Sequence, residues 1–224
     1  MQNFKKHFIA ENLNELFSKR LRNSRSKGID KYNAKTFEMD YLKKLENIEK
    51  KCLKGDYEFT PFLELLKVKG RNKVPRMISI PTIRDRLVLL ALKEYLHEIF
   101  SENVNRKRPN AFIKSIKNYI SKTSTEIHFV KLDVKAFYDT IDHNILLSIL
   151  LKKNIDPLAY NLIEKAISTP TVPTNAKKDS YGSFTPSKGV PQGTSISNIL
   201  AQIYLAELDA TISKRKYLKG QYKY

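Results

Sequence analysis

One aspartate in this sequence stands where it could do chemistry, near the end of an apolar stretch. Residues 127–134 read IHFVKLDV, which predicts a buried strand with Asp133 close to its end. A buried carboxylate is costly unless a cation or a hydrogen-bond donor meets it. A metal ligand is therefore the economical interpretation of Asp133. The alternative is an aspartate that caps the following turn.

A second segment has the composition of a ligand-binding loop. Residues 189–193 read GVPQG, so that Gly189 and Gly193 bracket a rigid Pro-Gln pair just ahead of a predicted helix. Glycine lets a backbone approach a ligand closely, and a helix N-terminus favours phosphate. The alternative is an ordinary loop that enters a helix.

The charge of the chain points to a polyanionic partner. Lys and Arg total 41 against 23 Asp and Glu, a net charge of +18 over 224 residues. Three basic runs carry no acid, at 67–76, 103–125 and 214–223. One such run alone is equally typical of a solvated face, a calmodulin-like helix or a helix on an anionic membrane. Three runs separated by apolar segments favour a basic groove that binds nucleic acid through its phosphates.

The composition also sets limits on the class of protein. A hydrophobic fraction of 41% is enough for a folded core. The longest apolar run, at 87–92, is far shorter than the roughly 18–20 residues of a membrane-spanning helix, so no membrane partner is expected. The N-terminus has no signal-like apolar region, and Cys52 is the single cysteine, so we expect a cytoplasmic chain.

Local patterns predict an α+β fold. Helical spacing, caps and prolines predict helices at 34–53, 83–100, 109–121, 141–151, from 157 onward and at 195–212. Two strand-like runs, 62–69 and 73–80, flank the turn 70–72 and predict a basic hairpin. Residues 169–188 are rich in Pro, Ser and Thr and predict a loop with a short strand pair near 181–185.

Four motifs together resemble reverse transcriptases. LDVKAFYD at 132–139 resembles their first catalytic palm motif, and GVPQG at 189–193 resembles their nucleotide-site loop. RMISIP at 76–81, continued by DRLV at 85–88, is similar to their fingers segment, and KGID at 27–30 resembles an element of the group II intron-encoded branch. The motifs occur in the family's order between residues 28 and 210. The sequence is identified as similar to bacterial reverse transcriptases of the group II intron, retron and abortive-infection kind.

This resemblance implies a right-hand polymerase. It would have an incomplete palm sheet with flanking helices and a basic fingers hairpin. The implied divisions are an N-terminal basic helical extension at 1–27, fingers at 28–125 and a partial palm at 126–224. The implied partners are an RNA template or non-coding RNA, a DNA primer or product, and deoxynucleoside triphosphates. The implied biological role is intron mobility, retron DNA synthesis or antiviral defence.

The resemblance also assigns roles to the motif residues. Asp133 would hold catalytic Mg²⁺ with help from the backbone carbonyl of Val134, in two-metal nucleotidyl transfer. Tyr138 would be the steric gate that excludes a 2′-hydroxyl, unless it is only a core aromatic. Gln192 and Gly193 would lie against the incoming nucleotide.

Charged side chains of the other motifs receive roles as well. Arg76 and Arg86 would contact the triphosphate, with Arg84 as a competitor, unless they only form salt bridges or touch the template. Asp139, Asp142 and His143 are expected to be caps at the turn into a helix. The residues expected to bind nucleic acid come from the first two basic runs: Lys69, Arg71, Lys73, Arg106, Lys107, Arg108, Lys114 and Lys117.

The sequence departs from the family in one respect. No two aspartates are adjacent, so the Tyr-x-Asp-Asp motif that supplies the other metal carboxylates is absent from these residues, and we expect the thumb to be missing with it. We therefore expect this polypeptide alone not to polymerise DNA. A C-terminal remainder of a longer protein or a second chain would supply the motif and the thumb. The competing hypotheses are a non-catalytic RNA-binding scaffold and untemplated or protein-primed synthesis.

Overall fold

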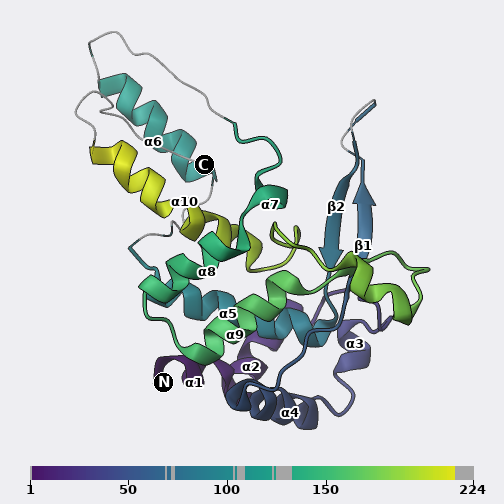
Figure 1. Cartoon of the computed structure of the whole chain (residues 1–224). Helices are drawn as coiled ribbons and strands as arrows, with labels where there is room; N and C mark the ends of the chain where they lie inside the picture. Colours follow the sequence, from purple (N-terminus) through teal and green to yellow (C-terminus); the bar gives the residue numbers. More distant parts are fainter. Residues whose placement is uncertain are drawn as a thin grey trace.

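The fold is built mainly of helices, with a small three-stranded sheet at one side of them (Figure 1). The computed structural model describes residues 2–68, 70–71, 74–102, 104, 109–122, 124 and 133–214. The expected α+β class is confirmed. The predicted strand at 127–134 lies largely outside the described residues, and 133–134 have no regular structure.

The N-terminal segment is helical and belongs to the core. It forms α1 (Gln2–Phe8), α2 (Ala10–Leu16) and η1, a single π-helical turn (Phe17–Leu21). Phe4, Phe8 and Leu13 are buried, and α1 and α2 pack against α5 (Ile83–Ile99). The basic residues of this segment therefore lie on helices whose apolar side chains are part of the core.

The single helix predicted at 34–53 is wrong, because the chain forms two. α3 (Ala34–Phe37) ends before α4 (Tyr41–Lys54), and Asp40 between them takes a left-handed conformation with φ of 54°. Lys44 donates from Nζ to the carbonyl oxygens of Phe37 (3.1 Å) and Met39 (2.6 Å). These bonds satisfy carbonyls that the end of α3 leaves without helical partners. Helical spacing continues across the break, so the periodicity did not reveal it.

The predicted hairpin is confirmed with shorter strands. β1 (Phe62–Lys67) pairs antiparallel with β2 (Arg76–Ile80), from Leu63 opposite Ile80 to Lys67 opposite Arg76. β3 (Thr171–Val172) pairs parallel with the start of β1, giving the order β2-β1-β3. In Figure 1 the far end of the hairpin projects away from the helices.

The strand pair predicted near 181–185 is wrong. Residues Lys178–Phe184 form a 3₁₀ helix, η2. Its Ser180 and Ser183 hydroxyls donate to the carbonyls of Lys177 (2.8 Å) and Ser180 (2.7 Å). Such local bonds from serine stabilise tight turns in competition with a sheet ladder.

The remaining helices follow the predictions closely. They are α6 (Pro109–Lys122), α8 (His143–Lys152), α9 (Pro157–Ser168) and α10 (Ser197–Lys214). The short helix α7 (Phe137–Thr140) was not predicted. Asp142 and Asp156 cap α8 and α9 through their side chains. The core lies between α5, α8, α9 and the start of α10, where Leu92, Leu146 and Leu200 are fully buried. In the part of the chain that the structure describes, no helix is long and apolar enough to cross a membrane.

Candidate active site

The 189–193 loop is hydrogen-bonded to the turn that carries α7. The amide of Val190 donates to the carbonyl of Tyr138 (2.8 Å), and the amide of Gly189 donates to the carbonyl of Ile141 (2.7 Å). Gly189 has φ of +88°, and a Cβ there would lie 3.0 Å from the carbonyl oxygens of Tyr138 and Asp139. Only glycine therefore allows this close contact without strain.

The other end of the loop is attached to the sheet. The amide of Ser79 on β2 donates to the carbonyl of Gln192 (2.7 Å). Gly193 has φ of +95°, and a Cβ there would lie 2.6 Å from Cγ2 of Ile78. The loop thus bridges the α7 turn and the edge of β2.

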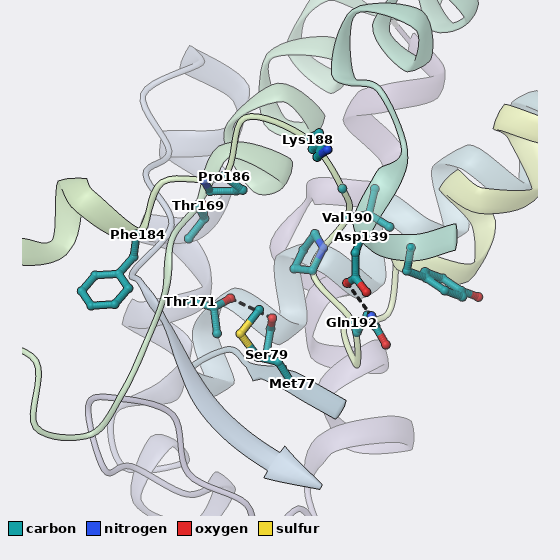
Figure 2. A pocket seen from close by; sticks show the side chains of 13 residues that line it. Met77, Ser79, Asp139, Thr169, Thr171, Phe184, Pro186, Lys188, Val190 and Gln192 are labelled. Carbon is teal, nitrogen blue, oxygen red and sulfur yellow. Dashed lines mark hydrogen bonds between the residues drawn. The ribbon is translucent and has the colours of Figure 1, made fainter. Parts of the chain in front are cut away.

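A pocket of about 280 Å³ opens between these elements. Figure 2 shows Asp139 and Gln192 at one side, with Ser79 and Thr171 below and Phe184 across the opening. The hydroxyls of Ser79 and Thr171 are hydrogen-bonded at 2.8 Å. The pocket is lined by Met77, Ser79, Tyr138, Asp139, Thr169, Thr171, Phe184, Pro186, Lys188, Gly189, Val190, Pro191 and Gln192.

Of the three residues expected to be caps, Asp142 is confirmed. Its Oδ1 accepts from the amide of Ile145 at 3.0 Å. Asp139 instead accepts from Nε2 of Gln192 at 2.7 Å, and Nε2 of His143 lies 2.6 Å from the carbonyl oxygen of Gly189. The expectation for Asp139 and His143 was wrong because both side chains reach a loop about fifty residues later rather than their own helix.

Asp133 is exposed just ahead of α7, and Val134 is 54% exposed. The burial argument that drew attention to Asp133 is therefore wrong, since its carboxylate is accessible to solvent. Among the residues that the structure describes, no three His, Cys, Asp or Glu side chains gather into a metal site. A carboxylate and a backbone carbonyl are oxygen donors of the kind that Mg²⁺ prefers, so these residues fit part of a magnesium site.

The side chain of Arg84 is held in a hydrogen-bonded network around the buried Asp85. Its Nη2 donates to Oδ1 of Asp85 (3.1 Å), Oγ1 of Thr60 (2.9 Å) and the carbonyl of Glu58 (3.0 Å). Asp85 is fully buried and also accepts from the hydroxyl of Tyr57 at 2.7 Å. Burial opposes the charge of Arg84, but Tyr57 and Asp85 outweigh it and raise the pKa of the guanidinium. Arg84 thus forms a salt bridge with Asp85.

Arg86 and Arg76 lie in different surroundings. Arg86 is half-buried and donates from Nε to the carbonyl of Pro81 (3.0 Å) and from Nη1 to the hydroxyl of Ser24 (2.9 Å). Burial lowers the pKa of its guanidinium, against a smaller opposing effect of Asp30. Arg76 is exposed on β2. Neither arginine lines the pocket.

The residues expected to bind nucleic acid are only partly described. Arg71 is exposed at the tip of the hairpin, and Lys114 and Lys117 are exposed on α6. The others, Lys69, Lys73, Arg106, Lys107 and Arg108, lie outside the described residues.

Several pocket residues were missed by the sequence reasoning. Thr171 comes from a predicted loop, and Phe184 comes from the strand pair that was wrongly predicted near 181–185. Met77 and Ser79 lie within the motif RMISIP, but neither residue was assigned a role there. Lys188 stands directly before the glycine-bracketed loop, and this position was a signal that could have found it.

Comparison with known proteins agrees with the motifs. The family described as "Reverse transcriptase (RNA-dependent DNA polymerase)" matches residues 67–223. The group II intron-encoded protein LtrA of Lactococcus lactis subsp. cremoris is 29% identical over 199 residues, which cover 85% of this chain and 31% of LtrA. The putative COX1/OXI3 intron 2 protein of Saccharomyces cerevisiae is 27% identical over 208 residues, 88% of this chain and 22% of that protein.

A third relative is shorter. Protein YkfC of Escherichia coli is 24% identical over 204 residues, 87% of this chain and 51% of YkfC. The chain thus spans between about a fifth and a half of the length of these relatives. The family match covers more than half of the chain, and with these relatives it shows that the chain belongs to the reverse transcriptase family of RNA-directed DNA polymerases.

Proposed function

We propose that this chain forms the fingers and part of the palm of an RNA-directed DNA polymerase, with the pocket as the site of the incoming deoxynucleotide. The observation that carries the proposal is the bridge made by the 189–193 loop. It joins Tyr138 to β2, so that residues from three distant parts of the chain line one pocket. The proposed reaction, RNA-directed DNA synthesis, rests on the family membership. The proposed position of the nucleotide rests on the pocket.

Tyr138 is proposed as the gate that selects the sugar. Its half-buried ring lines the pocket and packs edge-to-face on Phe137, with the ring centroids 5.8 Å apart. Phe137 in turn lies 6.3 Å from the ring of Tyr204 on α10. An aromatic ring that is held in place by such packing is suited to exclude the 2′-hydroxyl of a ribonucleotide by steric contact.

Asp133 and the carbonyl of Val134 are proposed to hold part of a magnesium site. Bound divalent cations would activate the primer 3′-hydroxyl and stabilise the leaving pyrophosphate. One carboxylate does not hold two cations against their mutual repulsion. We therefore propose that a Tyr-x-Asp-Asp segment, from a longer form of this protein or from a second chain, completes the site.

The cationic residues are proposed to bind the phosphates of template, primer and nucleotide. Arg76 is the better candidate for the triphosphate, since Arg86 is already hydrogen-bonded to Ser24 and Pro81. Lys114 and Lys117 are exposed on one helix and suit a nucleic-acid backbone. Because LtrA is described as group II intron-encoded, a structured intron-type RNA is our proposed template, ahead of a retron or a defence role.

The proposal is tested by nucleotide binding on a dideoxy-terminated primer annealed to an RNA template. The wild-type chain should bind dGTP with Mg²⁺ more tightly than GTP opposite a templating cytosine. Tyr138→Ala should abolish that preference, whereas Tyr160→Ala, a control on α9 away from the pocket, should keep it. Asp133→Asn should remove the dependence on Mg²⁺. Equal binding of dGTP and GTP by the wild-type chain would overturn the proposed site.

A primer-extension assay tests the need for further carboxylates. The isolated polypeptide should not extend the primer with Mg²⁺. Metal-dependent extension by this polypeptide alone would contradict the proposed completion by another segment. A non-catalytic RNA-binding scaffold would bind the RNA template but would not bind dGTP in the nucleotide-binding assay.

A further inference from the structure

Asp139 and Gln192 form a contact that neither the motifs nor the family match assigns a role. Nε2 of Gln192 donates to Oδ1 of Asp139 at 2.7 Å, and both side chains line the pocket (Figure 2). The residues are 53 positions apart in the sequence. Their contact therefore depends on the docking of the 189–193 loop.

Both backbones are fixed independently of this contact. The amide of Asp139 donates to the carbonyl of Ala136 (2.9 Å), within the α7 turn. The carbonyl of Gln192 accepts from Ser79, as described above, and the amide of Val190 is bonded to Tyr138. Only the side-chain torsions remain to be ordered, so one hydrogen bond is enough to select a single orientation of the Gln192 amide.

The chemistry of the pair decides which way the amide faces. An ionised carboxylate accepts hydrogen bonds and does not donate them, so the NH₂ end of Gln192 must face Asp139. The carbonyl Oε1 is then the end that remains to accept from a ligand. A bond to a charged acceptor is also stronger than one between neutral groups.

The same carboxylate affects where phosphate can bind. Its negative charge repels phosphate at this side of the pocket. Lys188, also on the lining, offers the opposite charge. A nucleotide bound in this pocket would therefore place a neutral part, its sugar or its base, beside Gln192.

We propose that Asp139 is a positioning residue, which holds the amide of Gln192 so that its Oε1 accepts a hydrogen bond from a donor on the sugar or base of the nucleotide. This inference rests on the proposed function, since it assumes that the pocket takes a nucleotide. Asp139 acts through Gln192 and need not touch the nucleotide.

The orientation of Gln192 can be tested without any ligand. The side-chain NH₂ resonances of Gln192, assigned by their loss in Gln192→Met, report whether the amide is ordered. Asp139→Asn keeps an acceptor oxygen and should leave the two proton shifts well separated. Asp139→Leu removes the acceptor and should bring them toward the values of a solvated amide. Asp142→Leu removes an acid and a helix cap three residues away, and should leave Gln192 unchanged.

A double-mutant cycle tests the coupling to the nucleotide. With dGTP, Mg²⁺ and the terminated primer–template, Asp139→Leu should weaken dGTP binding about tenfold, and Asp139→Asn by a few-fold at most. In a Gln192→Met background, Asp139→Leu should have no further effect. An equal loss in both backgrounds would overturn the positioning role, because Asp139 would then act without Gln192.

The two hypotheses fail in different ways. If the wild-type chain binds no nucleotide, the proposed function is overturned, and so is the proposed role of Asp139 in nucleotide binding. If the wild-type chain binds dGTP but Asp139→Leu leaves the Gln192 resonances unchanged, the positioning role is overturned and the nucleotide site stands.

Discussion

The guanidinium of Arg86 donates a 2.9 Å hydrogen bond from Nη1 to the hydroxyl of Ser24, 62 residues earlier in the chain. Ser24 begins the segment that leads to Gly28, where a Cβ would lie 2.7 Å from Cα of Thr82. The loop before α3 is therefore attached directly to the start of α5. This contact explains why Arg86, a cation in the DRLV motif, is half-buried.

Replacing Arg86 with Met should release this loop. Loss of two hydrogen bonds from a charged donor favours local opening, and trypsin should cleave at the exposed Arg25 and Lys27 about tenfold faster. Ser24→Ala removes one of the two bonds and should give a smaller increase. Unchanged cleavage in Arg86→Met would mean that the contact does not hold the loop.

A methyl group at Gly193 should destabilise the fold. The side chain would meet Ile78 at 2.6 Å in a backbone conformation with φ of +95°. We expect Gly193→Ala to lower the free energy of unfolding in urea by about 1–3 kcal/mol. Gly182→Ala is the matched control, because nothing lies within 4 Å of a Cβ there. Equal stability of the two variants would contradict the close contact between the loop and β2.

The contact between α1 and α5 should weaken in acid. Hydrogen bonds from Lys6 (2.7 Å) and with His7 (2.8 Å) lower the pKa of Glu98 below its ordinary value of 4.5. A lowered pKa means that the ionised carboxylate stabilises the folded state at neutral pH, and that this stabilisation is lost as the pH falls through the folded-state pKa. Because the groups are partly exposed, the effect should be about 1 kcal/mol or less.

Urea unfolding of Glu98→Gln measures this contribution. The variant should be less stable than the wild type at neutral pH, and the difference should shrink below about pH 4. Glu102→Gln, which removes an exposed acid beyond the end of α5, serves as the control. A difference that persists unchanged in acid would contradict the assignment to the Glu98 carboxylate.

Two lysines on α6 should contribute to RNA binding through charge alone. Lys114→Ala with Lys117→Ala should weaken binding similarly for unrelated RNA sequences, and should reduce the salt slope by about 1 per lysine. Lys43→Ala with Lys50→Ala on α4 removes the same charge from a helix that Figure 1 shows at the opposite end of the molecule. A loss confined to some RNA sequences, or an equal loss in the control, would contradict a phosphate-binding role for α6.

Local signals in the sequence predicted most helices and the hairpin correctly. Prolines and caps marked the starts of α6 and α9, and the turn 70–72 marked the hairpin. Two of the predicted elements were wrong. Asp40 breaks a helix whose apolar spacing is uninterrupted, and serine hydroxyls hold η2 in a segment taken as a strand pair.

The candidate site was predicted as a set of motifs and not as a geometry. The two glycines were singled out from their residue type and spacing, and Tyr138 and Gln192 from the family resemblance. The structure brings Tyr138, Gln192 and Gly189 into one pocket. Asp139 and His143 were expected to be caps because they stand where the family has a turn from a strand into a helix. Thr171 and Phe184 carried no local signal, since their place in the pocket depends on the packing of β3 and η2.

The sequence by itself determined the family, most of the elements and the residue types that can bind metal, sugar and phosphate, because each follows from short-range patterns. Only the tertiary structure decided that Gln192 faces Asp139, that Arg84 and Arg86 serve internal contacts, and that Asp133 is exposed. These pairings join residues from distant parts of the chain or depend on what is packed around a side chain. They are set by the packing of helices and loops against one another, which no local pattern records.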